Sequence, residues 1–492
     1  MNNIFSLVLA IALALVACSD GSDGGMTAGL LPITIPAISD PPAEGEPSLL
    51  STTFPLGEVG YRQQEFFLTG VASAFTNLAE LGSDGMWSVE PGETADYRTR
   101  VLIYLPEDMA LFSGSVFVEW LNVTTGFELP VTYGTVHNEL LREGHVIVMA
   151  SAQYTGVEGS ESALLPLHLK EFNPARYSSL YHPGDSFSYD IFTQVAGALR
   201  EGGENSLLAG AEVTHVFAMG QSQSASYLVT YYNAVQPLYQ AYDGFMIQSR
   251  GPGSARLAQE PLAAIPTPET VLLRTDSDTV VINVESESDV FARSGVSASQ
   301  DDNSHYRLWE VAGSAHNDEY TFVSGRNDIG DDPRFAMVVE QTSILRFQEC
   351  NLPMNSGYLS WPASAAIHAL NRWARGGEPP VNVPRLDRAG NEPEFLLDEV
   401  GNVTGGLRTS YVEVPAAVLS GLGQEGNAFC FLFGTTALFD AATMAARYVN
   451  KAGYVAAVSR SVADGIDQGT LLAPDGERII EAASLQWDTL EN

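Results

Sequence analysis

The chain has 492 residues, and its 24 lysines and arginines against 60 aspartates and glutamates give a formal net charge of −36 at pH 7. Such an acidic chain repels a phosphate backbone, so the composition excludes nucleic-acid binding as a main function. Hydrophobic residues make up 45% of the chain, which is enough to bury a large core and excludes a disordered acidic tail.

Residues 1–17 are predicted to be a lipoprotein signal peptide. An apolar run, too short to span a bilayer comfortably, ends at Leu15-Val16-Ala17-Cys18. This tetrapeptide resembles the bacterial lipobox, in which the cysteine is lipidated and becomes the first residue of the mature chain. The resemblance implies a lipid anchor at Cys18 in the bacterial envelope, and Ser19 implies the outer membrane, with the body on the periplasmic side. The alternative is an ordinary cleaved signal with a chance cysteine.

Residues 18–48 are predicted to be a flexible tether to a folded body, 49–492, because they are rich in Asp, Gly, Ser and Pro and show no periodic pattern. Once Cys18 is lipidated, Cys350 and Cys430 remain as an even pair in an oxidising compartment. They form either a disulfide or two buried thiols. No cysteine–histidine cluster has zinc-site spacing, so no metal is expected.

The body alternates short apolar runs with longer mixed segments, which is the pattern of βαβ units around a mostly parallel sheet. Several runs are continuous and rich in Val, Ile, Leu and Phe, as strands buried on both faces should be. The predicted strands are residues 100–105, 115–122, 145–151, 213–219, 244–248, 279–284 and 306–311. A helix over 221–234 is predicted to follow the fourth of these strands directly.

Two segments are predicted to lie outside this alternating core. Residues 153–189 form a long stretch between two strands, which predicts a lid or a wall of the acyl site, with a loop packed on the core as the alternative. After about residue 360 the composition changes, and we expect a C-terminal extension, 360–492, that packs on the core instead of folding alone. Helices are predicted there over residues 366–375, 436–448 and 453–463.

The sharpest local signal is Gly220-Gln221-Ser222-Gln223-Ser224, where an apolar strand runs into a helix. This is the nucleophile-elbow arrangement, in which small residues two positions either side of the nucleophile let the strand turn sharply into the helix. Ser224 stands where the usual motif has its second glycine. The motif predicts Ser222 as a nucleophile; taken alone, it also fits a strand-to-helix turn with a serine N-cap.

The order of later polar residues strengthens this interpretation. The predicted strand 279–284 is followed at once by carboxylates, and the predicted strand 306–311 is followed by a loop histidine, His316. A serine, then an acid after a strand, then a histidine after the final strand is the chain order of α/β-hydrolases. Because His305 precedes its strand and His368 lies on a helix, His316 is predicted to be the base.

The acid is chosen among Glu285, Glu287 and Asp289. Alternation along an extended segment would put all three side chains on one side, so direction does not choose among them. In many α/β-hydrolases the acid comes three residues after a glycine that ends the strand, and Ser286 takes that place relative to Asp289. We therefore predict Asp289, with Glu287 as the alternative. The other carboxylates are expected to be solvated or to pair with Arg293.

An oxyanion hole is expected to combine the backbone N–H of Gln223 with one from the loop after residues 115–122. No His-Gly-Gly-Gly motif occurs in that loop, so the second donor is located only to Val123 or Thr124. Asn122 is as well explained by a structural role in the loop as by a catalytic one.

Several segments together resemble the bacterial alpha/beta hydrolase domain-containing proteins, a group regarded as serine hydrolases. They follow one another from about residue 55 to about residue 480, and are Arg98–Tyr104, Val118–Val123, His182–Ile191, Gly220–Ser224, Glu285–Val290, Leu308–His316 and Gly405–Thr409. The family usually shows Gln-Ser-Gly-Arg at the elbow, whereas this chain has Gln223-Ser224-Ala225-Ser226. The resemblance implies an α/β-hydrolase domain over 49–492, with helices on both faces of a mostly parallel sheet.

The combined prediction is a serine hydrolase that acts on a small-molecule or lipid-like carboxylic ester through Ser222, Asp289 and His316. The mechanism implies an acyl-enzyme intermediate and no metal or organic cofactor. Two other functions remain open: a noncatalytic envelope binding lipoprotein on the same fold, and a serine peptidase or transacylase that uses the same triad.

Overall fold

The computed structural model describes residues 29–163, 165–203, 206–345, 348–390, 394–426 and 429–490. The predicted signal peptide, the predicted lipidation site Cys18 and the first part of the predicted tether lie outside the described residues. Within the described part of the chain, none of the helices combines the length and the apolar composition needed to cross a bilayer.

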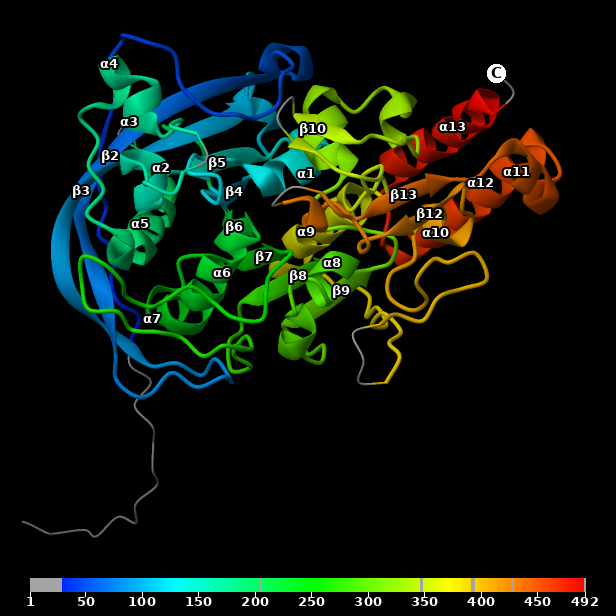
Figure 1. Ribbon diagram of the computed structural model, residues 1–492. Coiled ribbons are helices and arrows are strands. Elements are labelled where there is room, and N and C mark those ends of the chain that lie inside the picture. Colours follow the sequence, from blue (N-terminus) through cyan, green and yellow to red (C-terminus); the bar gives the residue numbers. More distant parts are fainter. Residues whose placement is uncertain are drawn as a thin grey trace, which may run out of the picture.

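A single nine-stranded sheet organises the core, in the order β1-β2-β3-β5-β4-β6-β7-β8-β9 (Figure 1). The first three strands and β5 pair antiparallel, and the pairs from β5 through β4 to β9 are parallel. Every segment predicted as a strand lies in this sheet. The strands are β1 (Ala37–Ser39), β2 (Tyr61–Asn77), β3 (Val89–Pro106), β4 (Ser115–Trp120), β5 (Val146–Ala150), β6 (His215–Gln221), β7 (Gly244–Gln248), β8 (Val280–Ser286) and β9 (Tyr306–Val311).

The sequence prediction missed β1 and the long antiparallel pair β2 and β3, apart from residues 100–105. Because β1 pairs with β2, the predicted flexible tether is wrong for residues 37–39, which belong to the folded body. The polar and apolar residues of this pair are mixed because β2 intersperses buried side chains with half-buried and exposed ones, and the first half of β3 is mostly exposed. The two strands pair from Tyr61 and Pro106 to Asn77 and Val89, with a register shift after Ser73. An edge ribbon of this kind lacks the continuous apolar run of a central strand.

Alternate residues of the central strands fill two separate apolar layers. On β4, Val116, Val118 and Trp120 belong to one layer, while Phe117 belongs to the other. The first layer is closed by α5 and α6, and the second by α1 and α9, so helices cover both faces of the sheet (Figure 1). Burial on both faces explains why these strands are uniformly apolar in sequence.

The helices follow the strands in the order expected for crossover connections. They are α1 (Val131–Arg142), α2 (Tyr154–Glu158), α3 (Leu169–Phe172), α4 (Pro174–Tyr177), α5 (Ser188–Arg200), α6 (Gln223–Thr230), α7 (Gln236–Tyr239), α8 (Glu287–Val290), α9 (Ser360–Ala374), α10 (Ser410–Glu413), α11 (Ala441–Tyr448), α12 (Lys451–Gln468) and α13 (Ala473–Thr489). A π-helical segment, Tyr231–Val235, joins α6 to α7, so the helix predicted over 221–234 has an irregular second half.

The predicted C-terminal extension begins with a helix of the core, because α9 packs on β7, β8 and α1. Beyond it, α10 to α13 and the antiparallel pair β12 (Ala417–Ser420) and β13 (Thr435–Leu438) lie at the β9 side of the sheet (Figure 1). The helix predicted over 436–448 is wrong in its first part, where residues 436–438 belong to β13 and pair with β12. The helix starts later, at an Asp440 N-cap whose side chain accepts from the Thr443 N–H.

The stretch 153–189, predicted as a lid or wall, carries the short helices α2, α3 and α4. Val157, Leu169, Tyr177 and Leu180 form an apolar cluster with Phe67 of β2. Most of the stretch therefore packs on the edge ribbon of the sheet. Its role as a lid stays a prediction.

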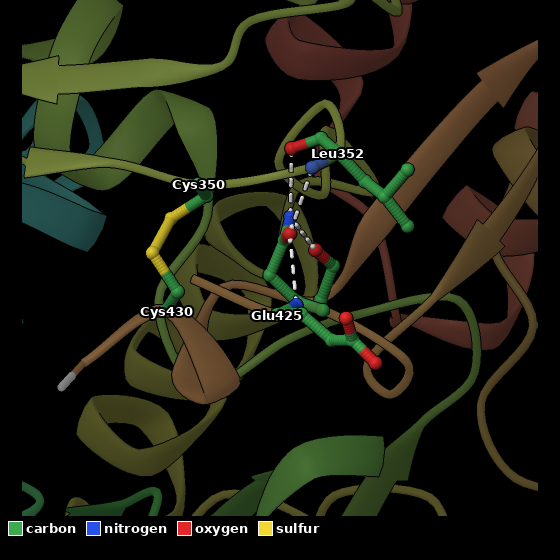
Figure 2. Close-up of a disulfide and its surroundings, with 6 residues drawn as sticks. Cys350, Leu352, Glu425 and Cys430 are labelled. Atoms are coloured by element: carbon green, nitrogen blue, oxygen red, sulfur yellow. Dashed lines mark hydrogen bonds between the residues drawn. A yellow bond between two sulfur atoms is a disulfide. The ribbon is translucent and has the colours of Figure 1, made fainter. Parts of the chain in front are cut away.

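A disulfide joins Cys350 and Cys430, with an S–S distance of 2.10 Å (Figure 2). The neighbouring backbone also pairs across these two segments, since the Asn351 N–H donates to the Glu425 carbonyl at 2.9 Å. The Leu352 N–H donates to Oε1 of Gln424 at 3.0 Å. The disulfide therefore lies within a set of contacts that fastens Gln424, Glu425 and Cys430 to the segment before α9.

Candidate active site

Ser222 lies at the sharp turn between β6 and α6. Its backbone is in the left-handed half of conformational space, with φ of +61° and ψ of −114°, which a non-glycine residue adopts at a cost in free energy. Gly220 explains why the turn needs small residues: a Cβ there would lie 3.0 Å from Leu228 and 3.1 Å from Ser224. Strain that the surrounding packing enforces at one serine is typical of a nucleophile elbow.

The imidazole of His316 lies against Asp289, with 2.5 Å between Nδ1 and Oδ1. His316 follows β9, and Asp289 lies in α8, the single turn that follows β8. Both side chains are buried. Asp289 is held in turn by Ser286, whose backbone N–H and hydroxyl both donate to Oδ2, at 2.8 and 2.6 Å. The structure thus brings the predicted acid and base into direct contact.

The three candidate carboxylates do not lie on one side, because Glu285 still belongs to β8 whereas Glu287 and Asp289 lie in α8, into which the chain turns at Ser286. Glu287 accepts the N–H groups of Gly313 and Gly421, at 2.6 and 2.7 Å, and Glu285 accepts the Arg250 N–H at 3.1 Å. The prediction that the remaining carboxylates are solvated or pair with Arg293 is therefore wrong, since both are buried and bound to backbone groups.

Arg293 instead contacts the predicted nucleophile and base. Its Nη1 donates to Ser222 Oγ at 2.8 Å and lies 3.2 Å from His316 Nε2. Because a guanidinium has only donors, Nε2 must accept, so the proton of a neutral His316 is on Nδ1, toward Asp289. This is the tautomer that a general base facing Ser222 requires.

Burial and charge keep this pair in complementary protonation states. Burial lowers the pKa of His316, the Asp289 carboxylate opposes that effect, and the Arg293 guanidinium lowers the pKa further. Burial alone would raise the pKa of Asp289, but His316, Arg293 and the Ser286 hydroxyl together outweigh it and hold the pKa below its usual range. Near neutral pH the pair is therefore an ionised carboxylate beside a neutral imidazole.

The loop after β4 is fastened to the elbow. The amide of Asn122 donates to the Gln221 carbonyl at 3.0 Å, and its Oδ1 accepts the Thr124 N–H at 2.9 Å. The Val123 N–H faces Oε1 of Gln223 at 3.4 Å. Both candidate donors are therefore already hydrogen-bonded, but the Val123 contact is the longer and weaker of the two. Val123 is thus the donor that an oxyanion would displace more easily, and Asn122 has a structural role. The Gln223 N–H has no acceptor within the described residues.

Ser222, His316 and Arg293 line one cavity of about 360 Å³. The cavity wall is mostly apolar, and Leu165 of the stretch 153–189 forms part of it. Five aromatic rings contribute: Phe127, Phe322, Phe429, Phe431 and Phe433. A cavity of this volume with a few convergent polar groups is the usual form of a small-molecule site.

A second group of polar side chains lies on α1 and α9. The ligand-type atoms of Glu139, Glu143 and His368 lie within 4.8 Å of one another. Glu139 already pairs with Arg142 and with Nδ1 of His368, at 2.5 and 2.7 Å. None of the three lines the Ser222 cavity, so this group is separate from the candidate active site.

The fold and the geometry of this site agree with a comparison against known families. The model of the family described as "Alpha/beta hydrolase domain" matches residues 36–481, so the chain belongs to that family. The predicted fold class and family resemblance are confirmed, and family membership supports a hydrolase activity. No curated protein matches the chain.

Solved structures with the same type of fold resemble the chain only distantly. A serine hydrolase without a lid from Xanthomonas campestris is 14% identical over 49% of this chain and 83% of its own, with a TM-score of 0.25. A glucuronoyl esterase from Solibacter usitatus is 10% identical over 51% and 71%, with a TM-score of 0.25. Acetyl xylan esterase 1 from Thermoanaerobacterium sp. is 10% identical over 37% and 52%, with a TM-score of 0.20. Likenesses this low carry no information about the substrate.

Proposed function

We propose that this chain is a serine hydrolase that cleaves carboxylic esters. The observation that carries the proposal is the arrangement around one cavity: a strained elbow serine, a buried histidine, and a carboxylate 2.5 Å behind that histidine. No single one of these features is specific, but their combination at the ends of β6, β8 and β9 is what acyl transfer requires.

In the first half of the reaction, Ser222 Oγ attacks the ester carbonyl and its proton passes to Nε2 of His316. The backbone N–H groups of Gln223 and Val123 stabilise the tetrahedral oxyanion. Collapse of this intermediate breaks the bond to the alcohol oxygen, which takes the proton from His316 and leaves as the alcohol. The acyl group remains on Ser222 as an ester.

In the second half, water attacks the acyl-enzyme while His316 removes its proton. The second tetrahedral intermediate releases the carboxylic acid, and His316 returns the proton to Ser222 Oγ. Asp289 stays ionised throughout, orients the imidazole and stabilises the imidazolium that forms twice in each cycle. Every proton and electron pair is supplied by the ester, water and these three side chains, so the cycle needs no cofactor.

Labelling with a fluorophosphonate probe tests this function. We expect the purified body to be labelled and to hydrolyse a short activated ester, and we expect Ser222→Ala to lose both properties while its circular dichroism spectrum stays the same. Full labelling of the variant would contradict the assignment of Ser222. Absence of labelling in the unmodified protein would favour a noncatalytic binding protein, whereas faster cleavage of peptide than of ester substrates would favour a peptidase.

We also propose that a lipid on Cys18 anchors this hydrolase in the bacterial envelope. The support is the sequence Leu15-Val16-Ala17-Cys18 followed by a polar segment rich in Gly and Pro. In a bacterial host, Cys18→Ala should move the protein from the detergent-requiring membrane fraction to the soluble periplasmic fraction. Sedimentation of this variant with membranes would contradict the anchor, and Ser222→Ala, which should remain membrane-bound, is the matched control.

A further inference from the structure

The cavity at Ser222 has a charge that is opposite to that of the molecule. The chain carries 60 acidic against 24 basic residues. Among the described residues, however, the formally charged side chains that line the cavity are Arg293 and Arg326, and no aspartate or glutamate lines it. Like charges without acidic partners are costly to hold in an apolar, partly desolvated site unless a ligand compensates them. The sign of this local charge therefore points to an anionic ligand.

Arg293 is the cation closest to the chemistry and is only weakly compensated. Its nearest carboxylate, Asp289, lies 4.0 Å from Nε, and that carboxylate is already bound to His316 and Ser286. The Nε group of Arg293 has no hydrogen-bond acceptor in the described part of the chain. A carboxylate that entered the cavity would offer the bidentate partner that this guanidinium lacks.

The present position of Arg293 is also unfavourable for catalysis. Its Nη1 lies between Ser222 Oγ, at 2.8 Å, and His316 Nε2, at 3.2 Å, where it takes the acceptor site that the Ser222 hydroxyl needs. When Ser222 attacks, the imidazole becomes positively charged beside a fixed guanidinium, and the two repel. An anionic substrate group that pairs with Arg293 would remove both obstacles at once.

Arg326 provides a second cation on the same wall. Its Nε donates to the Ser51 carbonyl at 2.9 Å, and no carboxylate lies within ion-pairing distance of it among the described residues. Unlike Arg293, it makes no contact with Ser222 or His316. It therefore adds to the positive potential of the cavity without touching the reacting atoms.

From these contacts we propose that the enzyme selects esters that carry a free carboxylate on an otherwise apolar body, and that Arg293 binds this carboxylate and thereby leaves the space between Ser222 and His316. This inference rests on the proposed esterase function and names its substrate class. Arg293 is a specificity-determining residue in this view, and the aromatic wall contacts the apolar part of the substrate.

The test uses two esters that differ only in the anionic group: mono-(4-nitrophenyl) adipate and 4-nitrophenyl hexanoate, in which a methyl group replaces the carboxylate. We expect kcat/KM of the unmodified enzyme to be about tenfold to a hundredfold higher for the adipate ester, the range that a charge-assisted bidentate contact supplies. Equal rates, or a preference for the hexanoate ester, would overturn the proposal without any variant.

The variant Arg293→Gln tests whether Arg293 is the source of the preference for the adipate ester. This variant should lose most of the adipate preference, and its kcat/KM for the hexanoate ester should rise, because the guanidinium no longer lies between nucleophile and base. Arg293→Lys should retain part of the preference as a point charge. Arg326→Gln is the matched control with the same change of charge in the same cavity, and it should reduce the preference less and not raise hexanoate turnover. Loss of preference in Arg326→Gln with full preference in Arg293→Gln would overturn the assignment to Arg293.

Failure of this inference differs from failure of the proposed function. If the unmodified enzyme reacts with a fluorophosphonate and hydrolyses 4-nitrophenyl hexanoate but shows no adipate preference, the substrate class is wrong and the esterase function stands. If it neither reacts with the probe nor hydrolyses either ester, the esterase function itself fails. Inhibition of the unmodified enzyme by hexanoate more strongly than by hexanamide, which has the same chain but no negative charge, checks the carboxylate site independently of any variant's folding.

Discussion

At the scale of single residues, neighbouring carboxylates take different roles according to their partners. Asp289 faces His316 and is held ionised, whereas Glu287 faces two backbone N–H groups. Burial raises the pKa of Glu287 to about 7, and the N–H groups of Gly421 and Gly313 only partly oppose that shift. The Asp289 carboxylate is suited to stabilising an imidazolium, whereas the Glu287 carboxylate holds the loops of Gly313 and Gly421 together.

Replacement of each carboxylate by its amide should separate these roles. Asp289→Asn presents an N–H to His316 Nδ1 and favours the wrong tautomer, so kcat for one activated ester at pH 8 should fall by about a thousandfold to ten-thousandfold. Glu287→Gln should change kcat of the folded enzyme only a few-fold but lower the free energy of unfolding by about 1–3 kcal/mol, because one backbone N–H then faces an amide donor. Urea titration measures the second effect.

Two other outcomes of these substitutions would change the assignment of the triad acid. A severe loss of kcat in Glu287→Gln with a mild loss in Asp289→Asn would reverse the assignment of the acid. Mild losses in both would place the acid on another strand. Because triad members act as a unit, Asp289→Asn added to His316→Ala should cause little further loss.

The position of the acid limb of activity follows from the surroundings of His316. Burial lowers its pKa, and Arg293 lowers it further against the opposing effect of Asp289. Since only the neutral imidazole accepts the proton of Ser222, kcat/KM should fall only below the usual histidine pKa of about 6.5. Arg293→Gln removes a guanidinium that lowers the pKa of His316. The pKa of His316 should therefore rise in this variant, and the fall of kcat/KM on the acid side should move to higher pH.

The pH dependence of kcat/KM for 4-nitrophenyl hexanoate measures this shift, because that substrate does not titrate. Arg326→Gln, which removes a cation that does not contact His316, should shift the limb much less. An acid limb that moves to lower pH in Arg293→Gln would contradict the electrostatic role given to Arg293.

At the scale of elements, the elbow between β6 and α6 depends on the volume of two side chains. A Cβ at Gly220 would be crowded by Leu228 and Ser224, at 3.0 and 3.1 Å. Ser224 is fully buried, and its hydroxyl has no hydrogen-bond partner within the described residues. The serine satisfies the steric requirement of the turn, but its polar group is buried at a cost.

Removal of that hydroxyl should therefore stabilise the protein. Ser224→Ala is expected to raise the free energy of unfolding by about 1 kcal/mol, since it deletes an unsatisfied group and places a better helix former in α6. Gly220→Ala is the contrasting variant and should lose about 1–3 kcal/mol through overpacking. Urea denaturation of both compares them, and a destabilised Ser224→Ala would mean that the hydroxyl has a partner.

The elements that the sequence predicted well are those whose pattern is local. Continuous apolar runs identified β4 to β9, and the elbow motif and the Ser-acid-His order identified the groups that meet at the cavity. The β2–β3 ribbon was missed because its exposed faces interrupt the apolar pattern. Arg293 was found in the sequence but not its contact with Ser222, because that contact depends on how the loop after α8 folds back, which no local pattern encodes.

At the scale of the whole molecule, the C-terminal extension supports the site from outside the sheet. The Gly421 carbonyl accepts the Ser288 hydroxyl at 2.6 Å, beside Asp289, and the Leu432 carbonyl accepts the Asn317 N–H at 3.0 Å, beside His316. Residues 429–433 also supply three aromatic rings to the cavity wall. The extension therefore helps to place both the acid and the base, and it shapes the space that the substrate enters.

The disulfide is the covalent part of this support, so its removal should affect both stability and substrate binding. Cys350 and Cys430 are 80 residues apart, and opening a loop of that length should lower the free energy of unfolding by about 3–4 kcal/mol in the Cys350→Ser, Cys430→Ser double variant. Because Cys430 begins the turn that carries Phe431 and Phe433, KM for an apolar ester should also rise more than kcat falls.

Urea denaturation and steady-state kinetics measure the two effects, and a reductant should bring the unmodified protein to the values of the double variant. Equal stability of the two proteins under oxidising conditions would contradict a structural disulfide, as would alkylation of both cysteines in the unreduced, unfolded chain.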